Sequence, residues 1–314
     1  MTELDRVEAV RQFGYTRAEA EFVTIAALHS GYFLRRQYYS KHGGMPLSLC
    51  QKVVALEHAD YAKYDNAQVY HLYGKSLYEA LGESDNRHRR ARDPFAVRAK
   101  LMGLDYVLAH PESRFLPTEA EKLSYFCDVR GFPLGSLPTK VYTGQRGRKT
   151  ERYFVDKFPI KLDPETEKVS ICYINEGTGT GPGFPSWLLQ YAPLLGELGT
   201  AEVVYVANVA GYFAQGAKEF AQRFPQQSGA INPDLLRYFE ARQKGEQDGF
   251  IGRTQAELNE YRTLARRYSE DRFEVLWRAW SKAETPPADG PGITFSTYLL
   301  PHDYRVAGTV GVTK

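Results

Sequence analysis

The 314-residue sequence has little of what marks disulfide-stabilised, zinc-binding or membrane-embedded proteins. Its three cysteines, Cys50, Cys127 and Cys172, are isolated and odd in number, so no disulfide framework or zinc-ligand spacing is present. No run of about 18 apolar residues occurs, which argues against a membrane-spanning helix. The polar, acidic segment Met1-Thr2-Glu3-Leu4-Asp5 is unlike a signal peptide. We therefore expect a cytoplasmic protein with buried thiols.

Catalytic patterns are equally scarce. The 7 histidines show no metal-ligand spacing, and there is no Gly-x-Ser-x-Gly elbow. The glycine-rich segment 177–183 invites a phosphate-loop interpretation, but no Gly-Lys-Ser/Thr ends it, and Pro182 and Pro185 remove amide donors. We expect no metal and no cofactor.

The size and composition allow two domains. The chain is 43% hydrophobic, which is ample for a core, and no period of about 20 to 50 residues recurs. The formal net charge is only +2, so any binding to nucleic acid would be local and salt-sensitive.

Residues 1–82 contain the pattern of a winged helix-turn-helix. Thr16-Arg17-Ala18-Glu19 is a capping box that begins a helix, which Gly31 ends. Two further helices are predicted over 34–41 and 47–57, and alternating residues then predict a hairpin over 61–73. Three helices and a hairpin in this order would present the third helix to a major groove.

The charge pattern favours DNA binding by this domain. From Phe22 to Leu56 there is no acidic residue, as expected of a surface that approaches phosphates. The third helix would read bases, while the second helix and the hairpin would contact phosphates. The predicted contacts to double-stranded DNA are Arg35, Arg36, Gln37, Ser48, Gln51, Lys52, Lys63 and Asn66. Alternatively, these are ordinary solvated side chains or part of a protein-interaction module.

Residues 83–94 are polar and lack apolar periodicity. The predicted DNA contacts Arg87, Arg89, Arg90 and Arg92 cluster there. The segment is either a basic arm that follows the DNA backbone or a solvated linker.

Residues 95–314 indicate an α/β domain followed by a mostly helical, charged region over 233–283, so the fold class is α/β (α+β overall). The predicted elements are helices over 95–109, 117–127, 184–198 and 212–224 and strands over 138–142, 152–155, 169–175, 201–207, 294–299 and 305–312. The alternation of buried strands and helices predicts at least one parallel strand pair. We expect this domain to serve homodimerisation or effector and partner binding, with Trp187, Trp277 and Trp280 as candidate interface residues.

One enzyme alternative is a metal-dependent nuclease. A strand with Asp156 followed by a strand ending near Glu176 resembles the core of restriction-endonuclease-like nucleases, in which two carboxylates hold Mg²⁺. Here the second strand lacks the Glu-x-Lys pattern, and Lys157 and Lys161 lie on the wrong segment. A nuclease-like fold that has lost its chemistry fits these residues better.

The chain resembles the replication-relaxation family of plasmid and mobile-element proteins over residues 16–210. The resemblance rests on Val69-Tyr70-His71-Leu72-Tyr73-Gly74-Lys75, on Val155-Asp156-Lys157-Phe158-Pro159 and on Tyr173-Ile174-Asn175-Glu176-Gly177-Thr178. The last motif resembles the family's Glu-x-Asp-x-Gly-Thr, but Tyr173 and Asn175 replace its two acids. The resemblance implies an N-terminal winged helix, a degenerate nuclease-like domain, and DNA binding in maintenance, transfer or transcriptional control of a mobile element.

The sequence therefore predicts a sequence-specific, double-stranded DNA-binding homodimer, a transcriptional regulator or a replication or transfer factor, with no membrane association. The alternatives are the metal-dependent nuclease and a non-catalytic protein-interaction subunit.

Overall fold

The protein has a mixed α+β fold. The computed structural model describes residues 1–43, 46–64, 67–143, 149–163, 168–177, 183–224, 233–250, 252–269, 274, 277–278, 280–281 and 292–304. Within these ranges, no helix combines the length and the apolar composition needed to cross a bilayer.

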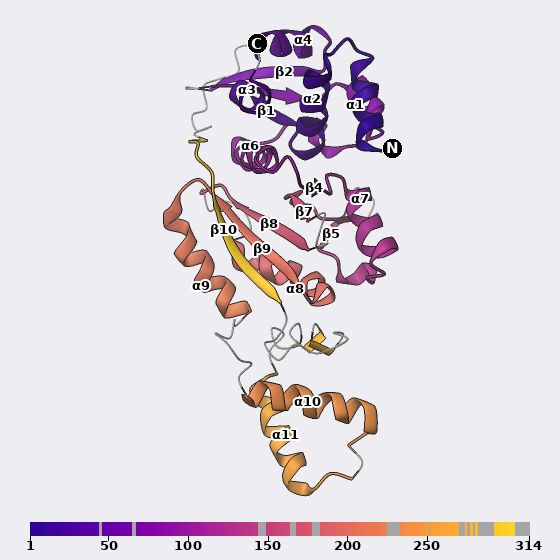
Figure 1. Cartoon of the computed structure of the whole chain (residues 1–314), viewed down its shortest axis with the longest axis vertical. Coiled ribbons are helices and arrows are strands. Elements are labelled where there is room, and N and C mark those ends of the chain that lie inside the picture. The colour runs from indigo at the N-terminus through magenta and orange to yellow at the C-terminus, as the bar shows by residue number, and fades with distance from the viewer. Residues whose placement is uncertain are drawn as a thin grey trace.

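The N-terminal region combines five helices with a small antiparallel sheet (Figure 1). Its elements are α1 (Glu3–Arg11), α2 (Arg17–His29), β1 (Tyr32–Leu34), α3 (Arg35–His42), α4 (Pro46–Ala55), β2 (Ala59–Tyr64), β3 (Ala67–Leu72) and α5 (Lys75–Ala80). The strand order is β1-β3-β2. The predicted capping box begins α2: the Thr16 hydroxyl accepts a bond from the Glu19 amide, and the Glu19 carboxylate accepts one from the Thr16 amide. The order from α2 to β3 is the order expected of a winged helix.

Gly31 ends α2 and lets another segment approach closely. Its φ of 76° lies in the left-handed region that favours glycine. A Cβ at this position would lie 2.7 Å from the Cβ of His88, so a side chain here would displace the segment 83–93. That segment contains the short 3₁₀ helix η1 (Arg87–Arg89).

A five-stranded sheet forms the middle of the molecule (Figure 1). The elements after η1 are α6 (Pro94–Leu108), β4 (Arg114–Phe115), α7 (Glu119–Leu123), the π-helical turn η2 (Ser124–Val129), η3 (Leu134–Ser136), β5 (Thr139–Thr143), β6 (Lys149–Tyr153), β7 (Ile160–Leu162), β8 (Val169–Asn175), α8 (Phe184–Leu198), β9 (Ala201–Ala207), η5 (Ala210–Tyr212), α9 (Phe213–Arg223), α10 (Pro233–Asp248), α11 (Gln255–Arg267) and β10 (Ile293–Leu299). The strand order is β10-β9-β8-β7-β4, and β5 and β6 form a separate hairpin. The pairs β8/β9 and β9/β10 are parallel, as predicted for β8 and β9, whereas β7 is antiparallel to β8 and to β4.

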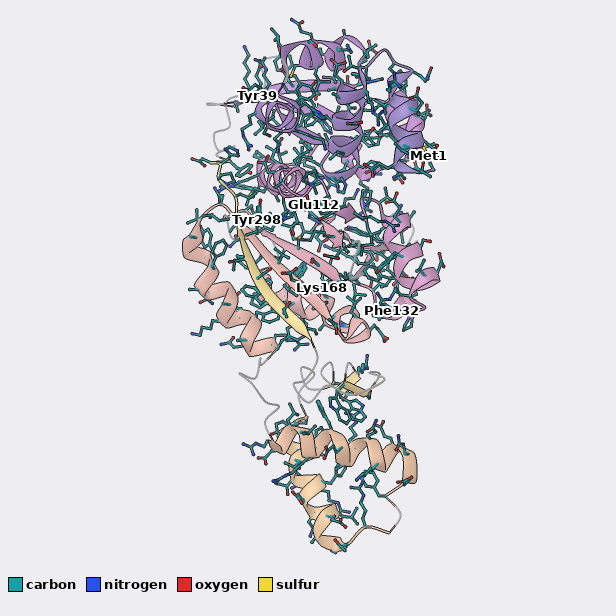
Figure 2. All side chains as sticks on the ribbon, viewed as in Figure 1. Met1, Tyr39, Glu112, Phe132, Lys168 and Tyr298 are labelled. Atoms are coloured by element: carbon teal, nitrogen blue, oxygen red, sulfur yellow. The ribbon has the colours of Figure 1, made fainter. Side chains whose placement is uncertain are left out.

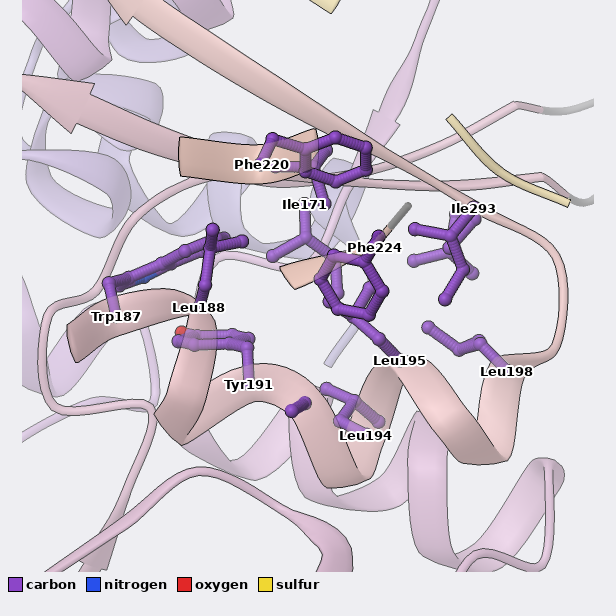
Figure 3. Close-up of a cluster of buried hydrophobic side chains, with 14 of the residues drawn as sticks. Ile171, Trp187, Leu188, Tyr191, Leu194, Leu195, Leu198, Phe220, Phe224 and Ile293 are labelled. Carbon is purple, nitrogen blue, oxygen red and sulfur yellow. The ribbon is translucent and has the colours of Figure 1, made fainter. Parts of the chain in front are cut away.

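Alternate residues of β8 serve two different cores. Ile171 faces α8 and α9, where leucines of α8 and the rings of Phe220 and Phe224 pack together (Figure 3). Cys172 and Ile174 face α6 on the other side of the sheet. This two-sided burial explains the continuous apolar run of the strand.

The helix α6 joins the N-terminal region to the sheet. Its Leu104 belongs to the N-terminal core, and its Leu101 and Met102 share a second core with strands β8 and β9. Its Tyr106 packs edge-on against Tyr298 of β10, which Figure 2 labels, with ring centroids 5.0 Å apart. Residue 94 is therefore not a loose boundary, because the two regions share buried side chains.

The helices α10 and α11 lie at the far end of the long axis (Figure 1). They pack on each other, and Trp277 and Trp280 stack near Phe239 with centroids 5.6 Å away in both cases. Both indoles are buried, so within the described chain they act as core residues. The strand predicted over 305–312 lies outside the described residues.

Candidate functional site

The outer surface of α4 is the first candidate site. We use the name α4 face for its exposed side chains. The α4 face comprises Leu47, Ser48, Gln51, Val54 and Ala55. Its two larger apolar members, Leu47 and Val54, are 48% and 38% exposed. The predicted recognition helix is therefore open to solvent, and two of its exposed side chains are apolar.

Two predicted DNA contacts on α4 are occupied by a carboxylate of the same domain. The Lys52 ammonium lies 2.5 Å from Glu19 Oε2, and the Ser48 hydroxyl donates to Glu19 Oε1 at 3.1 Å. Burial alone would raise the pKa of Glu19, but the hydrogen bonds from Lys52 and Thr16 outweigh it and lower that pKa. Glu19 stays ionised and neutralises Lys52.

Gln37 points inward rather than toward a phosphate, which corrects the prediction for it, and the half-buried Arg36 is paired with a carboxylate. The Arg36 guanidinium makes two bonds to the Asp105 carboxylate of α6, at 2.7 and 3.1 Å. Gln37 is fully buried; its side chain accepts from the Leu34 amide and donates to the Leu101 carbonyl. Both residues fasten α3 to the rest of the molecule.

Three predicted contacts of the helices and the hairpin are exposed and, in the part of the chain that the structure describes, bound to no carboxylate. Gln51 and Lys63 are exposed, and neither has a side-chain partner among the described residues. Arg35 is exposed at the start of α3, where its guanidinium donates to Tyr70 and Gln68 of β3. Those bonds hold the charge between α3 and the hairpin. Asn66 lies outside the described residues.

The segment 83–93 is anchored at His88 and Arg89 and exposed at residues 90–93, so it is not the free arm or the fully solvated linker that the sequence predicts. His88 is only 2% exposed, its carbonyl is bonded by His71 of β3, and its ring accepts from Lys100. Arg89 donates to the carbonyls of Tyr73 and Ser84. The segment shows no apolar periodicity because a single buried histidine, and not a row of apolar side chains, anchors it.

The other arginines of the segment diverge. Arg90 and Arg92 are both exposed, and Arg92 and the half-buried Arg87 line a cavity of about 530 Å³. We call this cavity the cationic cleft. It lies among the segment 83–93, α6, β5, the turn 155–159 and α8, and its basic side chains are Arg87, Arg92, Lys100, Lys140 and Lys157.

The lysines of the cationic cleft have neutral partners. The Lys100 ammonium donates to the Ser30 carbonyl at 3.0 Å, and the Lys157 ammonium donates to Asn86 Oδ1 at 3.1 Å. Burial, reinforced by the charges of Lys122, Arg87 and Arg92, lowers the pKa of Lys157 to about 7. Burial likewise sets the pKa of Lys100 well below its usual range, with Lys157 and Arg92 adding to the effect.

Asp156, the first carboxylate of the nuclease alternative, is a structural acceptor. It receives bonds from the Trp187 indole at 2.8 Å, from the Tyr191 hydroxyl at 2.9 Å and from the Phe158 amide at 3.1 Å. These donors fix α8 to the turn after β6. In the described part of the chain, no group of three or more His, Cys, Asp or Glu side chains could hold a metal ion. Asp156 and Glu176, the two carboxylates of the nuclease alternative, line the same cavity, but Asp156 is already bound by these three donors.

Lys100 and Lys140 were missed in the sequence, and Lys157 was noted only as a lysine on the wrong segment for a nuclease and within the motif 155–159. One signal was present: Lys100 falls on the apolar stripe of α6, three residues after Val97 and four before Leu104. A lysine at such a position must either snorkel or line a buried polar site. The other cations come from separate segments, and no local motif connects them.

Comparison with known proteins gives no relative. No family model, no curated protein and no solved structure matches this chain.

Proposed function

We propose that the protein is a sequence-specific, double-stranded DNA-binding protein of the bacterial cytoplasm, and that its N-terminal region acts as a winged helix. In this proposal α4 enters the major groove and the hairpin β2–β3 contacts the backbone. The observation that carries it is the open outer surface of α4 beside an exposed, pre-positioned Arg35 in the α2-to-β3 arrangement.

In this proposal Gln51, Arg35 and Lys63 make different kinds of contact with DNA. Gln51 offers an amide that can bond an adenine edge in two places, so it would discriminate bases. Arg35 and Lys63 would contact phosphates, which fixes the register but carries little sequence information. Lys52 contributes less than its charge suggests because Glu19 pairs with it.

A DNA titration tests the proposal. The full chain is titrated with the DNA upstream of its gene and with random DNA, at two salt concentrations. Gln51→Ala should weaken the selective complex by about 1–3 kcal/mol and relax specificity, whereas Lys63→Ala should weaken both complexes equally and reduce the salt slope by about 1. Lys75→Ala, on α5 and paired with Glu79, is the matched control and should change neither.

The oligomeric part of the proposal is separate. A homodimer would match a palindromic site, since each half-site would meet one α4. The stoichiometry of the complex, measured by sedimentation with a palindromic and a half-site duplex, decides between one and two copies.

A protein-interaction subunit is the second candidate. The exposed Leu47 and Val54 favour it, because large apolar side chains on a helix face more often meet protein than phosphate. If neither DNA binds at low salt, the DNA proposal fails and this candidate replaces it.

A further inference from the structure

The cationic cleft has more basic side chains than carboxylates. Five basic side chains line it, against the three carboxylates of Asp93, Asp156 and Glu176. Asp93 caps α6 by accepting from the Ala96 amide at 2.9 Å, and Asp156 is bound by Trp187 and Tyr191. Among the described residues, no ion pair joins a carboxylate to any of the five cations.

The five basic side chains line the cavity from different segments of the chain, and two of them, Arg92 and Lys140, are also exposed. Arg87 and Lys140 both approach the ring of Tyr142, at 5.0 and 5.6 Å from its centroid, from two different segments of the chain. The Lys100 ammonium donates to the His88 ring, and Lys100 and Lys157 are both half-buried. A group that pairs with the half-buried Lys100 and Lys157 must therefore enter the cleft.

The backbone at Lys157 is strained. Its φ of 58° is in the left-handed region that residues with a side chain rarely adopt, and its amide closes a tight turn onto the Phe154 carbonyl at 3.0 Å. Such strain persists where the surroundings hold a residue in place, and it is common in ligand-binding sites. Here it holds an ammonium group in a cavity with other cations.

Part of the cleft lining is apolar and aromatic. Phe95, Ala96 and Ala99 of α6 line one side, and Phe158 and Trp187 line another. Its volume of about 530 Å³ falls in the range of small-molecule sites, roughly 300–1,000 Å³, and is far larger than one phosphate ion requires.

We infer that the cationic cleft binds a small phosphate ester that carries a flat ring, of the size and chemistry of a mononucleotide. The phosphate lies among Arg87, Arg92, Lys100 and Lys157, and the ring lies against the apolar wall. The bound anion supplies the negative charge that the cleft lacks, so the lysines become fully protonated in the complex. This inference does not rest on DNA binding.

The test is a calorimetric titration of the full chain with AMP, GMP, CMP and UMP. Adenosine and inorganic phosphate serve as probes of each half of the ligand. We expect at least one mononucleotide to bind at micromolar to millimolar concentration and more tightly than either half. Arg92→Gln should weaken that binding several-fold without affecting folding, because the only described bond of Arg92 is from its backbone amide to the Tyr32 hydroxyl. Lys157→Gln should weaken it at least ten-fold, and Lys75→Gln should leave it unchanged.

Three outcomes would overturn the inference. The first is that none of the four nucleotides binds at 10 mM, roughly the weakest affinity a specific site offers. The second is that Arg92→Gln and Lys157→Gln bind as the unaltered chain does. The third is that duplex DNA displaces the nucleotide while Arg92→Gln weakens DNA and nucleotide alike, which would assign the cleft to nucleic acid.

Discussion

The N-terminal region and the cationic cleft pair their basic side chains with different kinds of partner. In the N-terminal region, Lys52 of α4 is paired with the Glu19 carboxylate and Arg36 of α3 with the Asp105 carboxylate. In the cleft, Lys100 and its neighbours meet carbonyls, an amide and aromatic rings. A stretch of sequence without acidic residues therefore does not guarantee a basic surface that lacks carboxylate partners. Glu19 and Asp105 both come from outside the acid-free stretch 22–56, and the fold brings them to it.

The largest loss of stability should come from removing the Asp105 carboxylate, which pairs with Arg36. Asp105→Ala leaves the Arg36 guanidinium, the Gln37 amide and the Tyr304 hydroxyl without their shared acceptor. Removing one partner of a largely buried ion pair destabilises by about 3–5 kcal/mol. Urea unfolding followed by circular dichroism measures the loss. Asp60→Ala, at an exposed position on β2, should stay within about 0.5 kcal/mol; equal midpoints for the two variants would contradict the prediction.

A smaller loss should follow Asp156→Ala, at the edge of the cleft. The indole of Trp187 and the hydroxyl of Tyr191 would lose their acceptor inside the core. Buried donors left unsatisfied destabilise by about 2–3 kcal/mol in total. The same urea experiment measures this, with the exposed Glu112→Ala as control. If the variant instead kept its stability and lost Mg²⁺-dependent DNA cleavage, Asp156 would be catalytic and the structural role assigned here would be wrong.

The sequence predicted the local elements well because their signals are local. Helix α8 and strands β8 and β9 agree with the predicted bounds, since an apolar run bounded by glycine and polar residues is read within a few positions. The three-residue strand β1 was missed, because its pairing with β3 is made by residues almost 40 positions away. The site was harder for the same reason. Gln37 looks like a phosphate ligand in sequence, and only the position of α6 shows that it is buried.

The free energy of unfolding should depend on pH through Lys157, because burial and the basic groups around it lower its pKa. Lys157 has a pKa of about 7 in the folded protein and 10.5 ordinarily, so between these values the unfolded chain holds more protons. The free energy of unfolding therefore gains a contribution that increases from about pH 7 to about pH 10.5. The charges that set this pKa are Lys122, Arg87 and Arg92, which lower it, and Glu119, which raises it.

Lys157→Met should remove that slope. Urea unfolding at pH 7 and at pH 9.5 should show a smaller rise in stability for the variant than for the unaltered chain. Lys75→Met, at an exposed site, is the control for the loss of one lysine. An equal rise in all three proteins would mean that Lys157 titrates as an ordinary surface lysine, and the cleft would then hold less uncompensated charge than its geometry indicates.

The smallest effect should come from removing the carboxylate partner of Lys52, so that this lysine, like those of the cleft, has no acidic partner among the described residues. Glu19→Gln keeps the capping box, since glutamine also serves at that position, but it removes the charge that neutralises Lys52 and leaves Ser48 a weaker partner. Under the DNA-binding proposal, the freed ammonium becomes available to a phosphate. Affinity for duplex DNA should then increase by about 0.5–1 kcal/mol, a few-fold in Kd, and the salt slope should steepen by about 1. Fluorescence anisotropy with a labelled duplex at two salt concentrations measures both quantities, with Glu21→Gln, paired to the exposed Arg17 of α2, as the control. An unchanged slope would place Lys52 away from the DNA, and the apolar α4 face would then be better explained as a surface for protein.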